Sequence, residues 1–194
     1  MRKWLIPVIV IVAIAAVIGF WAVGIKNGAV AKNQNVSKTW GDVQTAYQRR
    51  NDLIGNLVNT VKGAADFEKS TLTAVVEARA KATSVNVNAD NLTPEKLEEF
   101  NKAQSGVSSS LSRLLVSVEA YPQLKANENF LKLQDELAST ENMIQTSRVR
   151  YNESVVDYNS YILTFPNSMF LGKYKEKAYF NAVEGAEKPV EVKF

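Results

Sequence analysis

Apolar residues fill the first part of the chain without interruption. Residues 4–25 read WLIPVIVIVAIAAVIGFWAVGI, with no charged or strongly polar side chain. An α-helix of this length, at 1.5 Å rise per residue, measures ~33 Å and matches the ~30 Å hydrocarbon core of a bilayer. Trp4 and Trp21 lie near its two ends, as is typical of side chains at the headgroup level. The pattern predicts a transmembrane helix over residues 4–25.

A cleaved signal peptide is the alternative to an uncleaved signal anchor. Ala29-Val30-Ala31 has the small-x-small form of a cleavage site. However, the apolar stretch exceeds the ~7–15 residues of a signal-peptide core, and Lys26-Asn27 separates it from the alanines. We therefore expect a short tail, residues 1–3, and a retained single-pass membrane anchor. The positive charges on the two sides balance, so they do not predict on which side the rest of the chain lies.

Beyond residue 28, apolar residues recur at alternating spacings of three and four, which indicates helices that pack through heptad seams as in a coiled coil. The first seam runs from Val36 to Val61, a helix of about thirty residues that Gly63 ends. A second helix follows it through Arg79. The segment 83–92 loses the helical period and is predicted to be a loop.

Two more long helices complete the pattern. Thr93-Pro94 supplies an N-cap followed by proline, and this helix stops at Pro122. Asn127 caps the last helix, which stops at Pro166. Long helices with short connections favour antiparallel packing. The predicted fold class is therefore all-α, with the transmembrane helix followed by an up-down bundle of four helices over residues 28–166.

The last segment, residues 167–194, is irregular. It combines large apolar side chains with lysines and lacks a helical period; the apolar residues are Met169, Phe170, Leu171, Tyr174, Tyr179 and Phe180. Such a segment either docks on the bundle or forms a contact surface. We favour docking, because monomeric proteins rarely leave such patches exposed.

Composition removes most enzyme classes. The 194 residues include no cysteine and no histidine. This excludes disulfides, thiolate and imidazole metal ligands, cysteine nucleophiles and mechanisms with a histidine base. We predict a protein that is not an enzyme and uses no metal or cofactor.

Charge argues against nucleic acid as a partner. Lysine and arginine number 23 and aspartate and glutamate 20, and the two signs are interspersed past residue 41. A nucleic-acid surface instead shows clustered basic residues with few acids.

No other constellation of residues indicates catalysis. Single acids are spaced along the predicted helices, without a Glu-x-x-His pattern or a Ca²⁺-binding loop. The serine-rich run at 105–110 lies inside a helix and not on a strand-to-helix elbow, where a serine nucleophile would be expected. We assign no catalytic, cofactor-binding or metal-binding residue.

Three charged residues lie at or beside the seams. Arg50 occupies a seam position of the first bundle helix, and Glu141 and Arg148 flank the seam of the last. They either reach into water or face one another across the bundle. We favour a structural ion network of Arg50, Glu141 and Arg148.

Several blocks of the sequence, in order, resemble the LemA family of bacterial membrane proteins. The blocks of the first half are WGDV at 40–43, YQRRNDLI at 47–54, NLVNTVKG at 56–63 and AR at 78–79. Those of the second half are YPQLKANENF at 121–130, LQ at 133–134, TEN at 140–142, YN at 151–152 and 158–159, and FP at 165–166. Gly55 departs from the family's common proline, and both residues tolerate a kink.

The resemblance implies a single membrane helix followed by an antiparallel helical bundle, with no established catalytic residue to carry over. We expect a non-enzymatic, membrane-anchored protein that binds a protein partner as a scaffold or signalling accessory. The alternative is an enzyme or small-ligand receptor with a polar site inside the bundle, formed by Arg50, Glu141, Arg148 and nearby tyrosines. Self-association through the heptad seams is a third possibility.

Overall fold

A computed structural model of the protein describes residues 4–63, 67–89 and 92–181. The predicted tail, residues 1–3, and the chain after Asn181 lie outside the described residues. Throughout the described residues the ordered elements are helices and none is a strand. The all-α prediction is therefore confirmed.

The first helix is much longer than either segment that the apolar pattern predicts. α1 runs without a break over Leu5–Lys62, 58 residues. The predicted membrane helix is its first part, and the predicted helix of about thirty residues is its second part. The stretch that joins them, KNGAVAKNQN at 26–35, lacks proline, so nothing in it breaks the backbone hydrogen-bond ladder. Gly63 follows the last helical residue, as predicted.

The later helices begin close to the predicted signals. α2 spans Lys69–Ser84, α3 Pro94–Val118, α4 Pro122–Lys125, α5 Glu128–Leu163 and α6 Asn167–Phe170. The Thr93 hydroxyl accepts a hydrogen bond from the backbone N–H of Lys96 at 3.4 Å, and the Asn127 side chain accepts one from that of Phe130 at 3.1 Å. Both residues therefore act as the predicted N-caps.

The chain divides into two compact units. One, which we name the two-helix unit, joins Met1–Arg49 to Met143–Lys177, and the other, the four-helix unit, joins Arg50–Asn142 to Ala178–Phe194. α1 and α5 each contribute to both units, so two of the boundaries fall inside helices, and the third lies in the irregular segment after α6. We describe each unit separately.

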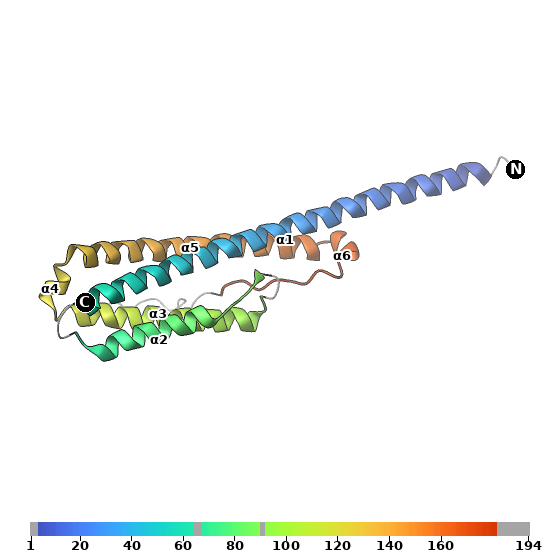
Figure 1. The fold of residues 1–194 in the computed structure, drawn as a ribbon. Coiled ribbons are helices and arrows are strands. Elements are labelled where there is room, and N and C mark those ends of the chain that lie inside the picture. Colours follow the sequence, from blue (N-terminus) through green and yellow to red (C-terminus); the bar gives the residue numbers. More distant parts are fainter. Residues whose placement is uncertain (1–3, 64–66, 90–91, 182–194) are drawn as a thin grey trace, which may run out of the picture. The chain divides into compact units, whose positions relative to one another are not determined.

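The four-helix unit has an apolar core. It is built from the end of α1, from α2 and α3, and from the start of α5, with α4 in the connection between α3 and α5 (Figure 1). Ile54 and Leu57 of α1, Val75 of α2, and Val107 and Leu114 of α3 are completely buried in this core. These are the seam positions of the predicted heptads, so apolar burial defines which face of each helix points inward.

The two-helix unit is built mainly from α1 and α5. Here residues 25–40 of α1 lie antiparallel to the last part of α5, as the paired contacts below establish. Val36, Trp40 and Val43 form the buried face of α1, and Tyr151 and Val155 are buried on α5. The Trp40 and Tyr151 rings meet edge to face with their centroids 5.3 Å apart.

Candidate functional site

The start of α1 is apolar and uncovered. The Trp4 side chain is 81% exposed and Phe20 is 82% exposed, and the apolar side chains between them are also largely exposed. The first buried side chains of the helix are Ile25 and Ala29. Among the described helices, α1 is the one that is long and apolar enough to cross a membrane.

Tyr161 of α5 meets α1 where its exposed stretch ends. The Tyr161 hydroxyl donates a hydrogen bond to the carbonyl oxygen of Ile25 at 3.1 Å. Gly28 allows this approach, because a Cβ added there would lie 2.2 Å from that hydroxyl oxygen. The glycine is therefore needed for space, not for an unusual backbone conformation.

Further polar contacts continue along the same pair of helices. Lys32 Nζ lies 2.7 Å from an oxygen of the Asp157 carboxylate and 5.3 Å from the centre of the Tyr161 ring. About one turn before Asp157 on α5, the Ser154 hydroxyl lies 2.7 Å from the Thr39 hydroxyl of α1. As the residue numbers rise on α1 they fall on α5, so the contacts fix both the antiparallel direction and the register of the two helices.

The segment after α6 docks on α5 through its backbone. Asn159 makes two hydrogen bonds to Lys177, donating from Nδ2 to the carbonyl oxygen and accepting the backbone N–H at Oδ1, each at 2.9 Å. The Tyr158 hydroxyl donates to the carbonyl oxygen of Lys175 at 3.2 Å. Leu171 is buried, whereas Met169 is 71% exposed. The segment is thus docked at some positions and open at others.

Two buried tyrosines of this unit have raised pKa values. Burial raises the pKa of Tyr151 well above its usual range. Burial, and to a smaller extent the neighbouring Tyr174, raises the pKa of Tyr158. Both side chains are therefore neutral at neutral pH; the Tyr151 ring packs against Trp40 and the Tyr158 hydroxyl donates to Lys175, and neither is suited to act as a base.

In the four-helix unit, Arg50 is buried and hydrogen-bonded. Its side chain is 3% exposed, and Nη1 lies 3.0 Å from Glu141 Oε1 and 3.1 Å from the Ser108 hydroxyl. Nη2 donates to the side-chain oxygen of Gln104 and to its carbonyl oxygen. Because the guanidinium donates to partners on α3 and α5, its geometry suits a structural cation rather than a ligand-binding one.

Two of these partners were missed from sequence. Gln104 is a polar residue at an apolar seam position, which is the signal that could have identified it, and Ser108 lies one turn further along α3. The third residue of the predicted network, Arg148, is half-buried and belongs to the two-helix unit. The structure thus brings Arg50 and Glu141 together within one unit and places Arg148 in the other. A network of all three stays a prediction.

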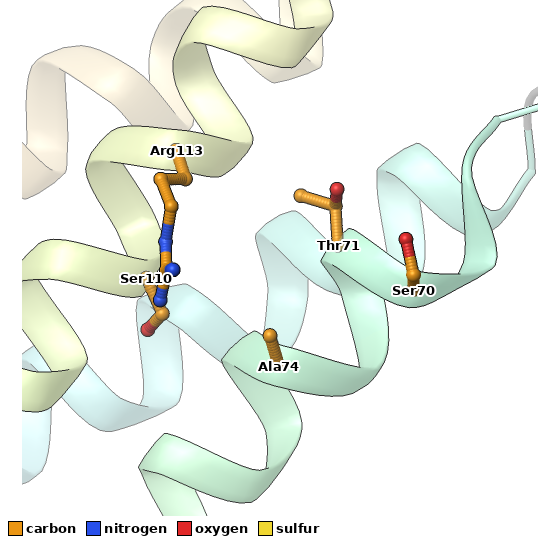
Figure 2. A pocket seen from close by; sticks show the side chains of 5 residues that line it. All are labelled: Ser70, Thr71, Ala74, Ser110 and Arg113. Atoms are coloured by element: carbon orange, nitrogen blue, oxygen red, sulfur yellow. The ribbon is translucent and has the colours of Figure 1, made fainter.

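Two hollows of the four-helix unit bear on ligand binding. Figure 2 shows the smaller one, where Ser110 and Arg113 of α3 face Ser70, Thr71 and Ala74 of α2. Its volume is about 200 Å³, below the ~300–1,000 Å³ of typical small-ligand sites. The larger, about 440 Å³, is lined by Lys62, Phe67, Lys69, Leu72, Thr73, Val76 and Glu77. Neither is lined by Arg50 or Glu141, the groups that the receptor alternative would use.

The described residues show no cluster of three or more side chains from His, Cys, Asp and Glu that could hold a metal ion.

Comparison with known sequences identifies the family. The LemA family model matches residues 39–194, about four fifths of the chain. The chain belongs to the LemA family. The predicted resemblance is confirmed, and the match covers the helical part from the middle of α1 onward.

Individual relatives of this LemA-family protein are distant. Protein LemA of Metamycoplasma hominis is 27% identical over 146 residues, which cover 75% of this chain and 63% of that protein. Magnetosome protein MamQ 2 of Paramagnetospirillum magneticum is 22% identical over 205 residues, covering 94% and 75%. Magnetosome protein MamQ of Magnetospirillum gryphiswaldense is 23% identical over 186 residues, covering 84% and 67%. The chain therefore spans less than two thirds of the first of these relatives.

Proposed function

We propose that this LemA-family protein is a non-enzymatic accessory protein of a bacterial membrane, which is anchored through residues 4–25 and binds a protein partner with its helical part. One observation carries the proposal. α1 is a single helix whose first part is apolar and exposed and whose remainder belongs to both packed units. An anchor continuous with a packed helix holds the adjoining unit at the membrane surface and raises its effective concentration there.

A row of apolar side chains on α5 supports protein binding. Val149, Val156 and Leu163 are each more than half exposed and are spaced seven residues apart. Residues at this spacing lie along one face of a helix and fit the apolar stripe of a second helix. We therefore propose that the row binds a helix of a protein in, or at, the same membrane.

The relatives' names are in keeping with such a role. Protein LemA and magnetosome protein MamQ are names that state no reaction. The internal hydrogen bonds of Arg50 also favour an accessory role over the alternative of an enzyme or receptor with a polar site inside the bundle.

Photo-crosslinking in living cells tests the proposal. The full chain would carry a photoreactive amino acid in place of Val156 on the row, or in place of Val116 on α3, which is 72% exposed and belongs to the four-helix unit. We expect a discrete adduct from position 156 that position 116 does not give. Removing residues 4–25 is expected to reduce it, because the anchor supplies the effective concentration.

The mass of the adduct distinguishes the remaining alternatives. An adduct of twice the mass of the chain would identify self-association, and a different mass a distinct partner. Equal adducts from both positions, or none from position 156, would contradict a binding site on this row. Protease digestion of a carboxyl-terminal tag in intact cells and in spheroplasts gives the side of the membrane on which the partner must lie.

A further inference from the structure

The end of α5 and the helix α6 form a second exposed apolar patch, close to the proposed anchor. We name Phe165, Met169 and Phe170 the corner. Phe165 is 76% exposed and Met169 is 71% exposed, and Phe170 is half-buried. Two large apolar side chains open to solvent within five residues are unusual outside a contact surface.

Two contacts within the two-helix unit give the position of the corner along α1. The Phe170 ring packs edge to face on Trp21, with the centroids 5.9 Å apart. Four residues before the corner, the Tyr161 hydroxyl is bonded to the backbone of Ile25. The corner therefore lies beside residues 21–25, at the end of the apolar stretch.

The same contact makes the corner continuous with the apolar surface of α1. Trp21 is half exposed, and Phe20, the preceding residue, is 82% exposed. The environment that surrounds Trp21 and Phe20, lipid or water, therefore also contacts Phe170 and its neighbours. For a membrane-anchored chain that environment is the boundary between acyl chains and headgroups, where aromatic side chains concentrate.

Charged residues near the corner fit an anionic lipid surface. Lys26 of α1 and Lys173, which follows α6, are both exposed. Asp157, the acid that faces this end of α1, is paired with Lys32, and Glu176 is the acid in the segment after α6. Lysines at the edge of an apolar patch interact favourably with anionic headgroups.

We infer that the corner inserts into the membrane interface as a second lipid contact of the two-helix unit. The inference rests on the proposed anchoring by residues 4–25 and extends it. A single helix leaves the attached unit free to rotate about the helix axis. A second contact on α6 fixes which side of the unit faces the lipid and which side, including the row on α5, remains accessible to a partner.

The absence of native cysteine makes a direct test possible. Single cysteines would replace Val12 in the anchor, Met169 in the corner or Val149 on α5, all exposed side chains. Each variant of the full chain would carry an environment-sensitive fluorophore, in vesicles of phosphatidylcholine and phosphatidylglycerol that contain spin-labelled lipid. Val149 is the matched control, because it lies ~21 Å from Leu163 along the helix at 1.5 Å per residue. Thermal unfolding of each variant checks that the fold is retained.

We expect lipid quenching and blue-shifted emission at positions 12 and 169, and neither at position 149. Quenching at 12 with none at 169 would overturn the lipid contact and leave the anchor in place. No quenching at position 12 would overturn the proposed anchor and, with it, this inference. Equal quenching at 149 and 169 would also overturn it, because the contact would then not be confined to the corner.

Discussion

The interactions that stabilise the two-helix unit differ from those that stabilise the four-helix unit. In the four-helix unit, side chains of α1, α2, α3 and α5, with Leu124 of α4, meet in one apolar core, and Arg50 is buried in the same unit. In the two-helix unit, the hydrogen bond from Tyr161, the ion pair of Lys32 and the hydroxyls of Thr39 and Ser154 follow one another along α1 and α5. Two helices bury less apolar surface than four, so specific polar contacts are needed to define their register.

This difference predicts that core truncation has the largest effect in the four-helix unit. Leu57 of α1 is completely buried, so Leu57→Ala is expected to lower the free energy of unfolding by about 2–5 kcal/mol. Leu131→Ala is the matched control on α5, where the side chain is 45% exposed, and should change it by less than about 1 kcal/mol. Urea unfolding in detergent, followed by circular dichroism, measures both. Equal losses would contradict the assignment of the core.

The buried arginine should have an intermediate effect. Arg50→Lys keeps the charge but cannot reach Glu141, Ser108 and Gln104 together, since lysine lacks the planar fork. We expect a loss of about 1–3 kcal/mol in unfolding free energy, the range for leaving buried polar groups unsatisfied. Arg49→Lys, at the neighbouring exposed position, is the control. Glu141→Gln should cost less than Arg50→Lys, because the Glu141 side chain is 41% exposed and water can replace its partner. If Arg50→Lys were neutral, the guanidinium would not stabilise the unit.

The smallest effect is expected at the close approach in the two-helix unit. Gly28→Ala places a methyl group against the Tyr161 hydroxyl, so the ring must move and its bond to Ile25 is lost. We expect the net effect to be a loss of about 1 kcal/mol, because overpacking outweighs the better helix propensity of alanine.

Gly24→Ala is the control for this substitution, since nothing lies within 4 Å of an added Cβ there. Hydrogen exchange of the backbone amides in the last turns of α5 measures the local loss of stability, and we expect faster exchange in Gly28→Ala than in Gly24→Ala. Combining Gly28→Ala with Tyr161→Ala should remove the penalty of the first change. Equally fast exchange in the Gly28→Ala and Gly24→Ala variants would show that the close approach of Tyr161 to Gly28 does not cause the loss of stability.

The sequence predicted those features that depend on local chemistry. Thr93 and Asn127 could be recognised as caps and Gly63 as a helix end, because each residue affects only the backbone within a few positions of it in the sequence. The apolar seams indicated the core for the same reason, since helical spacing alone places such residues on one face. The all-α fold follows from these signals together.

Features that depend on long-range register could not be predicted. Gly28 is needed because Tyr161, 133 residues later, lies against it, and the spacing of neither residue indicates the other. The two hydrogen bonds of Asn159 to Lys177, and those of Arg50 to Gln104 and Ser108, also depend on how distant segments align. The exposed corner has no periodic pattern, and its position beside Trp21 follows from three-dimensional contacts.

The central claim is that residues 4–25 remain on the protein and hold it in the membrane. The most direct test is the intact mass of the full-length protein from cells, measured separately in the pellet and the supernatant after alkaline carbonate extraction. We predict the uncleaved mass in the pellet. A shorter chain in the supernatant, cleaved after Ala31, would contradict the claim, since the apolar start of α1 would then be a signal peptide.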